Sequence, residues 1–159
     1  MMAEPRFLED FDMGEIFETE SRRVEAEEIV RFAEQHDPQP FHMDEEAARG
    51  HPLFRGLSAS GFHTLSITHD LILRRDIGHA WGLIGKGIDR LRWKRPVRPG
   101  DILRVIGRVV AIERNPEQPY GNLQVAIETI NQDAQPVMTM IVNTVVPSRL
   151  ALAPAKAAA

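Results

Sequence analysis

Apolar positions in the first third of the chain follow a helical spacing. Between residues 26 and 33 they recur at i, i+3, i+4 and i+7, which predicts an amphipathic helix. This helix must end near Asp37, because the following Pro38 disfavours helical geometry in the residue before it. We expect residues 38–40 to form a short extended bend and Asp44 to cap a brief helix after it, which leaves His42 in the connection between them.

A longer helix is predicted after a turn of small residues. Residues 56–61, Gly-Leu-Ser-Ala-Ser-Gly, combine flexible glycines with hydroxyls that cap helices, and they lead into residues 62–73. The apolar side chains of residues 62–73 are not confined to a narrow stripe. We therefore expect this segment to be the main helix, buried by a curved sheet on more than one side.

From about residue 80 the pattern changes to the alternation typical of strands. Residues 80–84 and 88–94 are predicted to be two strands separated by Gly-Lys-Gly. Three longer alternating segments follow, joined by stretches rich in turn-forming residues: 103–111, 123–129 and 137–145. Helices first and a meander of strands afterwards indicate an α+β protein rather than alternating βαβ units.

Composition narrows the class of protein. A chain of 159 residues fits one domain, which we place at residues 1–149, followed by a low-complexity, frayed tail at 150–159. Its apolar runs are too short to span a bilayer, and its start lacks a secretory signal. The absence of cysteine excludes disulfides and thiolate chemistry and favours a cytoplasmic location. A net charge of -4 argues against nucleic acid as the main partner.

Asp37 and His42 are the most suggestive pair for chemistry. A carboxylate and an imidazole lie five positions apart on a segment stiffened by two prolines, so both side chains can face one water molecule. Such a pair in fixed geometry contributes about 10²- to 10⁴-fold to the rate of a proton-transfer reaction. The same residues also fit a plain turn, with His42 bonded to a backbone carbonyl. Spacing alone leaves both interpretations open.

The turn before the main helix is the second candidate. Unpaired N–H groups at a helix start stabilise negative charge, and Gly61 lets a ligand approach its backbone closely. A simple helix cap explains the same residues equally well. Ser58 and Ser60 do not complete the G-x-S-x-G elbow of a nucleophilic serine. The histidines show no metal-ligand spacing, and no dinucleotide or P-loop motif is present, so we predict neither metal nor nucleotide cofactor.

Basic residues gather between Arg90 and Arg98. Within this cluster, Arg95 and Arg98 are candidates for binding the phosphates of a ligand. The alternative is that these charges lie on the solvent-exposed face of a strand, because a strand with one face in water also shows alternating charges.

Four ordered motifs resemble the MaoC-like dehydratase family, which includes the R-specific enoyl-CoA hydratases. They are Phe-Ala at 32–33, Asp-Pro-Gln-Pro-Phe-His at 37–42, Gly-Leu-Ser-Ala-Ser-Gly-Phe-His-Thr at 56–64, and Pro-Val-Arg-Pro-Gly-Asp at 96–101. The resemblance extends from about residue 7 to residue 147. It implies a single hotdog domain, in which a curved antiparallel sheet wraps a long helix, and a homodimer or higher homo-oligomer.

The resemblance also implies a function. Asp37 and His42 fall on the catalytic positions of the family motif, approximately G-D-x-N-P-x-H, although His36 replaces its glycine and Gln39 its asparagine. Gly61 would serve the thioester oxygen, with Ser60 where many members have histidine. The expected activity is reversible hydration of an enoyl thioester of coenzyme A or a carrier protein, without a cofactor. The rivals are a hotdog thioesterase and a non-catalytic acyl-CoA-binding subunit.

Overall fold

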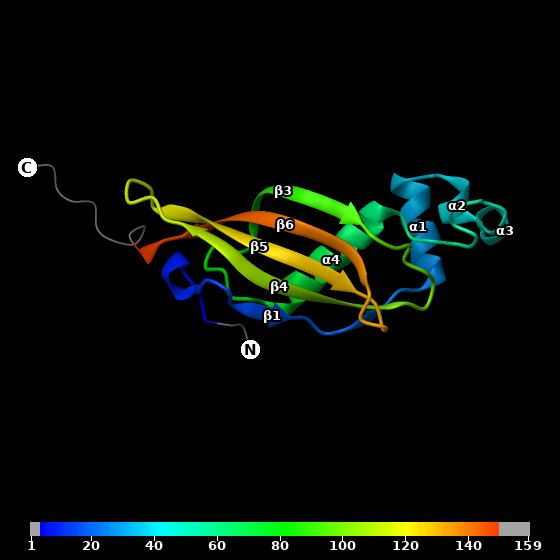
Figure 1. Cartoon of the computed structure of the whole chain (residues 1–159). Coiled ribbons are helices and arrows are strands. Elements are labelled where there is room, and N and C mark those ends of the chain that lie inside the picture. The colour runs from blue at the N-terminus through cyan, green and yellow to red at the C-terminus, as the bar shows by residue number, and fades with distance from the viewer. Residues whose placement is uncertain (1–3, 150–159) are drawn as a thin grey trace, which may run out of the picture.

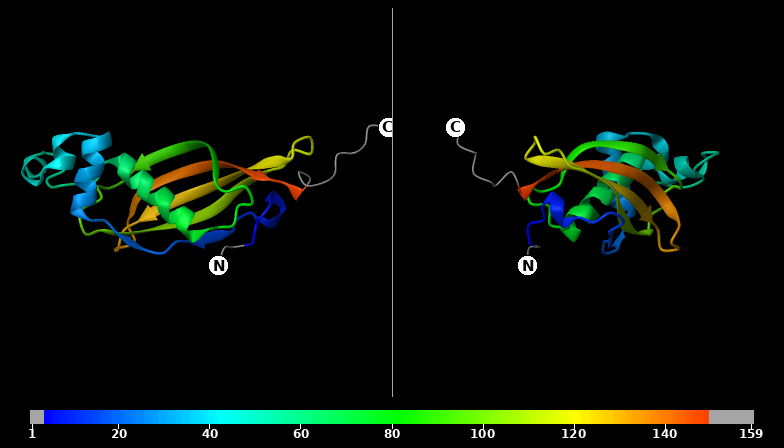
Figure 2. Two further views of the ribbon diagram at one scale, coloured as in Figure 1. Left: turned by 180° about the vertical axis from the view of Figure 1, so that it is seen from behind. Right: turned by 60° about the vertical axis from the view of Figure 1, so that its left-hand side comes forward.

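A computed structural model describes residues 4–149, so the predicted tail at 150–159 lies outside the described residues. A curved antiparallel sheet lies against one side of the long helix α4, and three shorter helices gather at one end of that helix (Figures 1 and 2). This is the hotdog arrangement expected from the sequence. The helices are η1 (Leu8–Asp10), α1 (Ala26–His36), α2 (Pro40–Met43), α3 (Glu45–Arg49) and α4 (Gly61–Arg75). The strands are β1 (Ile16–Glu18), β2 (Arg22–Arg23), β3 (Ile84–Trp93), β4 (Ile102–Glu113), β5 (Tyr120–Ile130) and β6 (Pro136–Pro147).

The sheet has the order β1-β4-β5-β6-β3, with β2 also paired to β4. The three long alternating segments form the predicted meander of β4, β5 and β6. The prediction of two strands around Gly-Lys-Gly is wrong, because β3 is one strand whose pairing with β6 shifts between Gly85 and Gly87 and again between Asp89 and Arg92. Glycine within a strand often marks a bulge and need not end the strand. Strands β1 and β2 are too short to show an alternation.

The core lies between the sheet and one face of α4. Ile67 and Leu71 of the helix are buried against inward-facing strand residues such as Leu103, Leu123 and Val137. Burial of each such side chain contributes about 1.5–3 kcal/mol. The other face of α4 carries the exposed side chains of Phe62 and Leu73, so one chain does not provide the expected burial on more than one side.

The short helices position the region around residues 37–42. Helix α1 ends at His36, as Pro38 requires, and Asp44 caps α3 by accepting a hydrogen bond from the Ala47 N–H at 2.8 Å. The extended bend is shorter than expected, because Pro40 already begins α2, a position where its missing N–H is harmless. His42 is therefore fixed on a helical turn rather than in a loop. Within residues 4–149 no helix is long and apolar enough to cross a bilayer.

Candidate active site

Asp37, His42 and the first residues of α4 line one cavity of about 560 Å³. It lies at the N-terminal end of α4, where α1, α2 and the last residues of β3 meet. Leu53, Phe54 and Val97 make part of its wall apolar, and Lys94 and Arg95 lie at its basic side. The fold thus brings the two sequence candidates, the acid/base pair and the small-residue turn, to the same place.

The imidazole of His42 is held in one orientation. Only 5% of the residue is exposed, and Nδ1 lies 2.6 Å from the carbonyl oxygen of Ser58. A carbonyl only accepts, so Nδ1 carries a proton, and in the neutral ring Nε2 has a free lone pair. The ring packs edge-on against Phe41, with centroids 4.5 Å apart, and Phe41 stacks on Phe54. The backbone contact expected for a plain turn is therefore present, and it directs Nε2 at Asp37.

Three polar groups lie next to the carboxylate of Asp37. Ser60 Oγ donates to Oδ2 at 2.7 Å, the Gln39 amide donates to Oδ1 at 2.6 Å, and His42 Nε2 lies 3.5 Å from Oδ2. Partial burial raises the pKa of Asp37, but the hydrogen bonds from Ser60 and Gln39, and the charge of His42 when its ring is protonated, outweigh it and lower the pKa below its ordinary value. Asp37 is therefore ionised at neutral pH.

Ser60 connects the start of α4 to Asp37. Its fully buried hydroxyl donates to Asp37 and accepts from the Phe62 N–H at 3.3 Å, so it caps α4 and faces the carboxylate. The Ser60 hydroxyl is therefore engaged with Asp37 and the helix start, and a contact between Ser60 and a thioester stays a prediction.

Gly61 occupies the first position of α4 and lines the cavity. Within residues 4–149 its N–H makes no hydrogen bond, as the first turn of a helix allows. The positive end of the helix dipole adds to the pull of this free donor on negative charge. This is the geometry expected of an oxyanion site, although Gly61 also simply begins a helix.

The Pro-Val-Arg-Pro segment anchors the turn before α4. The guanidinium of Arg98 donates to the carbonyls of Phe54, Gly56 and Leu57, and the Val97 carbonyl accepts from the Ala59 N–H at 2.9 Å. Arg98 thus holds backbone and does not face the cavity as a phosphate ligand would. Arg95 lines the cavity, with Nη1 donating to the Pro136 carbonyl at 2.8 Å, and phosphate binding by Arg95 stays a prediction.

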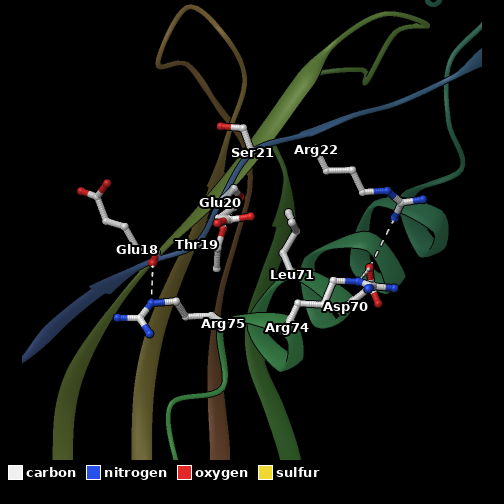
Figure 3. A pocket seen from close by; sticks show the side chains of 9 residues that line it. All are labelled: Glu18, Thr19, Glu20, Ser21, Arg22, Asp70, Leu71, Arg74 and Arg75. Carbon is white, nitrogen blue, oxygen red and sulfur yellow. Dashed lines mark hydrogen bonds and ion pairs between the residues drawn. The ribbon is translucent and has the colours of Figure 1, made fainter. Parts of the chain in front are cut away.

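A larger pocket of about 720 Å³ lies between the β1–β2 segment and the C-terminal half of α4 (Figure 3). Its charged groups are largely paired with neighbours. Arg74 contacts Asp70 at 2.8 Å, and Arg75 donates to the Glu18 carbonyl at 3.0 Å. Arg22 contacts Glu28 and, more distantly, Asp70. Neither Asp37 nor His42 lines it, so size does not identify the reactive site here. Among residues 4–149, no three His, Asp or Glu side chains gather as metal ligands.

Comparison with known proteins identifies the family. The MaoC like domain matches residues 10–129, which is most of the chain. The chain belongs to the MaoC-like dehydratase family. Its fold is the hotdog arrangement that the resemblance led us to expect.

Individual relatives agree with this assignment. The chain is 35% identical over 127 residues to the uncharacterized protein YdeM of Bacillus subtilis, covering 79% of this chain and 87% of that one. A MaoC-like dehydratase from Rhodospirillum rubrum has 43% identity and a TM-score of 0.85, over 91% of this chain and 98% of that one. An R-hydratase, PhaJ1 of Pseudomonas aeruginosa, shares the fold at 23% identity and a TM-score of 0.71, over 89% of this chain and 86% of that one.

Proposed function

We propose that the protein adds water reversibly to an enoyl thioester, giving a 3-hydroxyacyl thioester. One observation carries the proposal. His42 Nε2 and Asp37 Oδ2 lie 3.5 Å apart on a cavity that also holds the free N–H of Gly61. Hydration of a conjugated thioester needs these two things: a group that exchanges protons with water near C3 and C2, and a donor to the carbonyl oxygen, where negative charge develops.

The proposed reaction balances without a cofactor. The thioester oxygen accepts a hydrogen bond from the Gly61 N–H, which draws electrons from the C2=C3 bond. A water between Asp37 and His42 gives a proton to one of the pair while its oxygen bonds to C3, and the electron pair moves to the thioester as an enolate. The pair then returns the proton to C2. Elimination of water follows the same steps in reverse.

Two features favour His42 as the group that holds the proton between these steps. Nε2 has a free lone pair in the neutral ring, because Nδ1 donates to Ser58. The pKa of Asp37 is lowered by its bonds to Ser60 and Gln39, even though burial opposes them, so its carboxylate gains a proton less readily. An ionised Asp37 beside Nε2 then stabilises the protonated imidazole and accepts a hydrogen bond from the O–H that remains on the attacking oxygen.

The activity is tested by following two products at once. A short trans-2-enoyl-CoA absorbs through its conjugated double bond, and hydration removes that absorbance without releasing thiol. We expect loss of absorbance with no free coenzyme A. Release of thiol would instead identify a thioesterase on the same fold. Binding of acyl-CoA without turnover of either the enoyl or the 3-hydroxyacyl thioester would indicate a binding subunit.

The carrier of the acyl group is coenzyme A or the phosphopantetheine arm of a carrier protein in this proposal. Lys94 and Arg95 lie beside the apolar part of the cavity, where phosphates of either carrier would find positive charge. In the proposed orientation, the reactive double bond of the substrate lies near Asp37 and its charged end lies toward Lys94 and Arg95.

We also propose that the protein is a homodimer. The edge of β3 away from β6 has no strand partner within residues 4–149, and Ile84 and Ile88 are exposed on this strand. Beside it runs a groove between β3 and α4, lined by Leu65 and Val142 among others. An unpaired edge next to an apolar groove favours pairing with another strand. We expect light scattering at micromolar concentration to give a dimer mass or a multiple of it, and a monomer would contradict this.

Replacement of Ser60 by alanine should change the pH dependence of hydration. The change removes a hydrogen bond to the ionised Asp37, so the pKa of Asp37 rises toward its ordinary value. The activity that needs ionised Asp37 is then lost at a higher pH as the solution is acidified, and turnover falls about tenfold. The acidic limb of kcat/KM measures the shift. Ser21→Ala, at an exposed serine away from the cavity, is the control. An unmoved limb would show that Ser60 only caps the helix.

A further inference from the structure

The indole of Trp93 lies directly against Gly61. A Cβ atom at residue 61 would fall 2.4 Å from Cε2 of the indole and 2.7 Å from its Nε1, so the ring occupies the space that any side chain would need. The same Nε1 donates a hydrogen bond to the Gly61 carbonyl at 2.9 Å. Trp93 also lines the cavity that contains Asp37 and His42. The contact is therefore both steric and directional, and it lies at the candidate oxyanion site.

Neighbouring contacts fix the two ends of this arrangement. Phe62 packs edge-on against the indole, with ring centroids 5.6 Å apart. On the other side of Gly61, Ser60 is fixed by its hydrogen bond to Asp37. Gly61 is thus joined to the acid/base pair through Ser60 and to the end of β3 through Trp93. Because glycine is the most flexible residue and Gly61 lies at the end of a helix, these contacts restrict the peptide groups on either side of it.

We propose that Trp93 is a positioning residue that holds Gly61 so that its N–H points at the thioester oxygen. This inference rests on the proposed function and assigns a task to a further residue that lines the cavity of the acid/base pair. Because Gly61 would contact the thioester group itself, which all substrates share, Trp93 should affect turnover of short and longer acyl chains by the same factor.

The activity test separates the hydrogen bond from the ring. Trp93→Phe keeps an aromatic ring but removes the donor to Gly61, and Trp93→Ala removes both. A neutral hydrogen bond is worth about 1 kcal/mol, so Trp93→Phe should lower kcat about fivefold with KM little changed. Trp93→Ala should lower kcat by about 10²-fold, because the oxyanion donor is then no longer aligned. A residue that only packs the end of β3 would lower the melting temperature and leave kcat per folded molecule unchanged.

The chain supplies a matched control and a spectroscopic reporter. It has two tryptophans, and Trp81, 48% exposed, follows the opposite end of α4 from Trp93, which is 47% exposed. Trp81→Phe should keep wild-type activity and leave Trp93 as the one tryptophan, which can be excited selectively over Tyr120. Butyryl-CoA, a saturated thioester that cannot be hydrated, should then change the emission of Trp81→Phe and leave that of Trp93→Phe unchanged.

The outcomes distinguish this inference from the proposed function. Wild-type hydration together with a fully active Trp93→Phe variant and a Trp81→Phe emission that ignores butyryl-CoA would overturn the role of Trp93 alone. Absence of hydration in the wild type would overturn the function, and the emission test would still decide whether a thioester binds against Trp93. Melting temperatures of all variants show that the comparison is made on folded protein.

Discussion

Asparagine in place of Asp37 is expected to lower hydration turnover by at least about 10²-fold while the protein stays folded. Asn keeps the size of the side chain but does not carry the negative charge that faces His42 Nε2 at 3.5 Å. His42→Ala should reduce turnover to a similar extent, because it removes the free lone pair at Nε2. Turnover of an enoyl-CoA and circular dichroism, measured on the same samples, separate loss of chemistry from loss of structure.

The histidine variant needs a second form, because alanine also leaves the buried Ser58 carbonyl without its donor. An unpaired buried carbonyl costs about 1–3 kcal/mol of stability. His42→Asn places an amide near the position of Nδ1, so it keeps a donor to Ser58 while it removes Nε2. We expect His42→Asn to fold more stably than His42→Ala and to be equally inactive.

A double mutant gives the sharper test of the pair. If Asp37 and His42 act on one water, removing the second residue adds little once the first is gone, so the double mutant should be about as active as the poorer single mutant. Asp44→Asn is the matched control, since asparagine caps helices as well as aspartate and Asp44 does not line the cavity. Well-folded and fully active single mutants would remove both residues from the mechanism.

The elements that the sequence predicts correctly are those determined by interactions between residues close together in the chain. The end of α1 follows from Pro38, and the cap of α3 follows from Asp44, because each effect acts within a few residues. The meander was equally visible, since alternation over long segments reports burial of one strand face. The two register shifts in β3 could not be predicted, because glycine spacing alone does not distinguish an interruption from a continued strand.

Only part of the candidate site could be predicted from the sequence. Its acid/base pair lies on one short segment, whereas the contacts that orient the pair join residues far apart in the chain. Ser60 reaches Asp37 across 23 positions, and the Ser58 carbonyl reaches His42 across 16. The resemblance implied that Ser60 lies near the thioester, but it did not show that the Ser60 hydroxyl donates to the Asp37 carboxylate. The bonds from Arg98 to backbone carbonyls were equally invisible, because those carbonyls lie 41 to 44 positions away.

Trp93 was not recognised in the sequence at all. Its partner Gly61 lies 32 positions away, and an aromatic residue at a strand end is ordinary in itself. The available signal was the glycine at the start of α4, where serine or alanine would serve a helix better. A residue that opposes local propensity points to a requirement from elsewhere in the fold, which here is the indole ring.

If the indole of Trp93 is what requires glycine at residue 61, the effect of Gly61→Ala on stability should reverse when Trp93 is removed. Gly61→Ala should lower hydration turnover by at least about 10²-fold and also destabilise the protein, because the new Cβ displaces the indole that lies 2.4 Å from it and with it the N–H of residue 61. In a Trp93→Ala background the space is empty, and alanine is favoured over glycine within a helix by up to about 1 kcal/mol. There the same change at residue 61 should be neutral or stabilising. Denaturant unfolding of the four proteins measures both effects, and destabilisation of equal size in both backgrounds would show that Trp93 is not what requires glycine at this position.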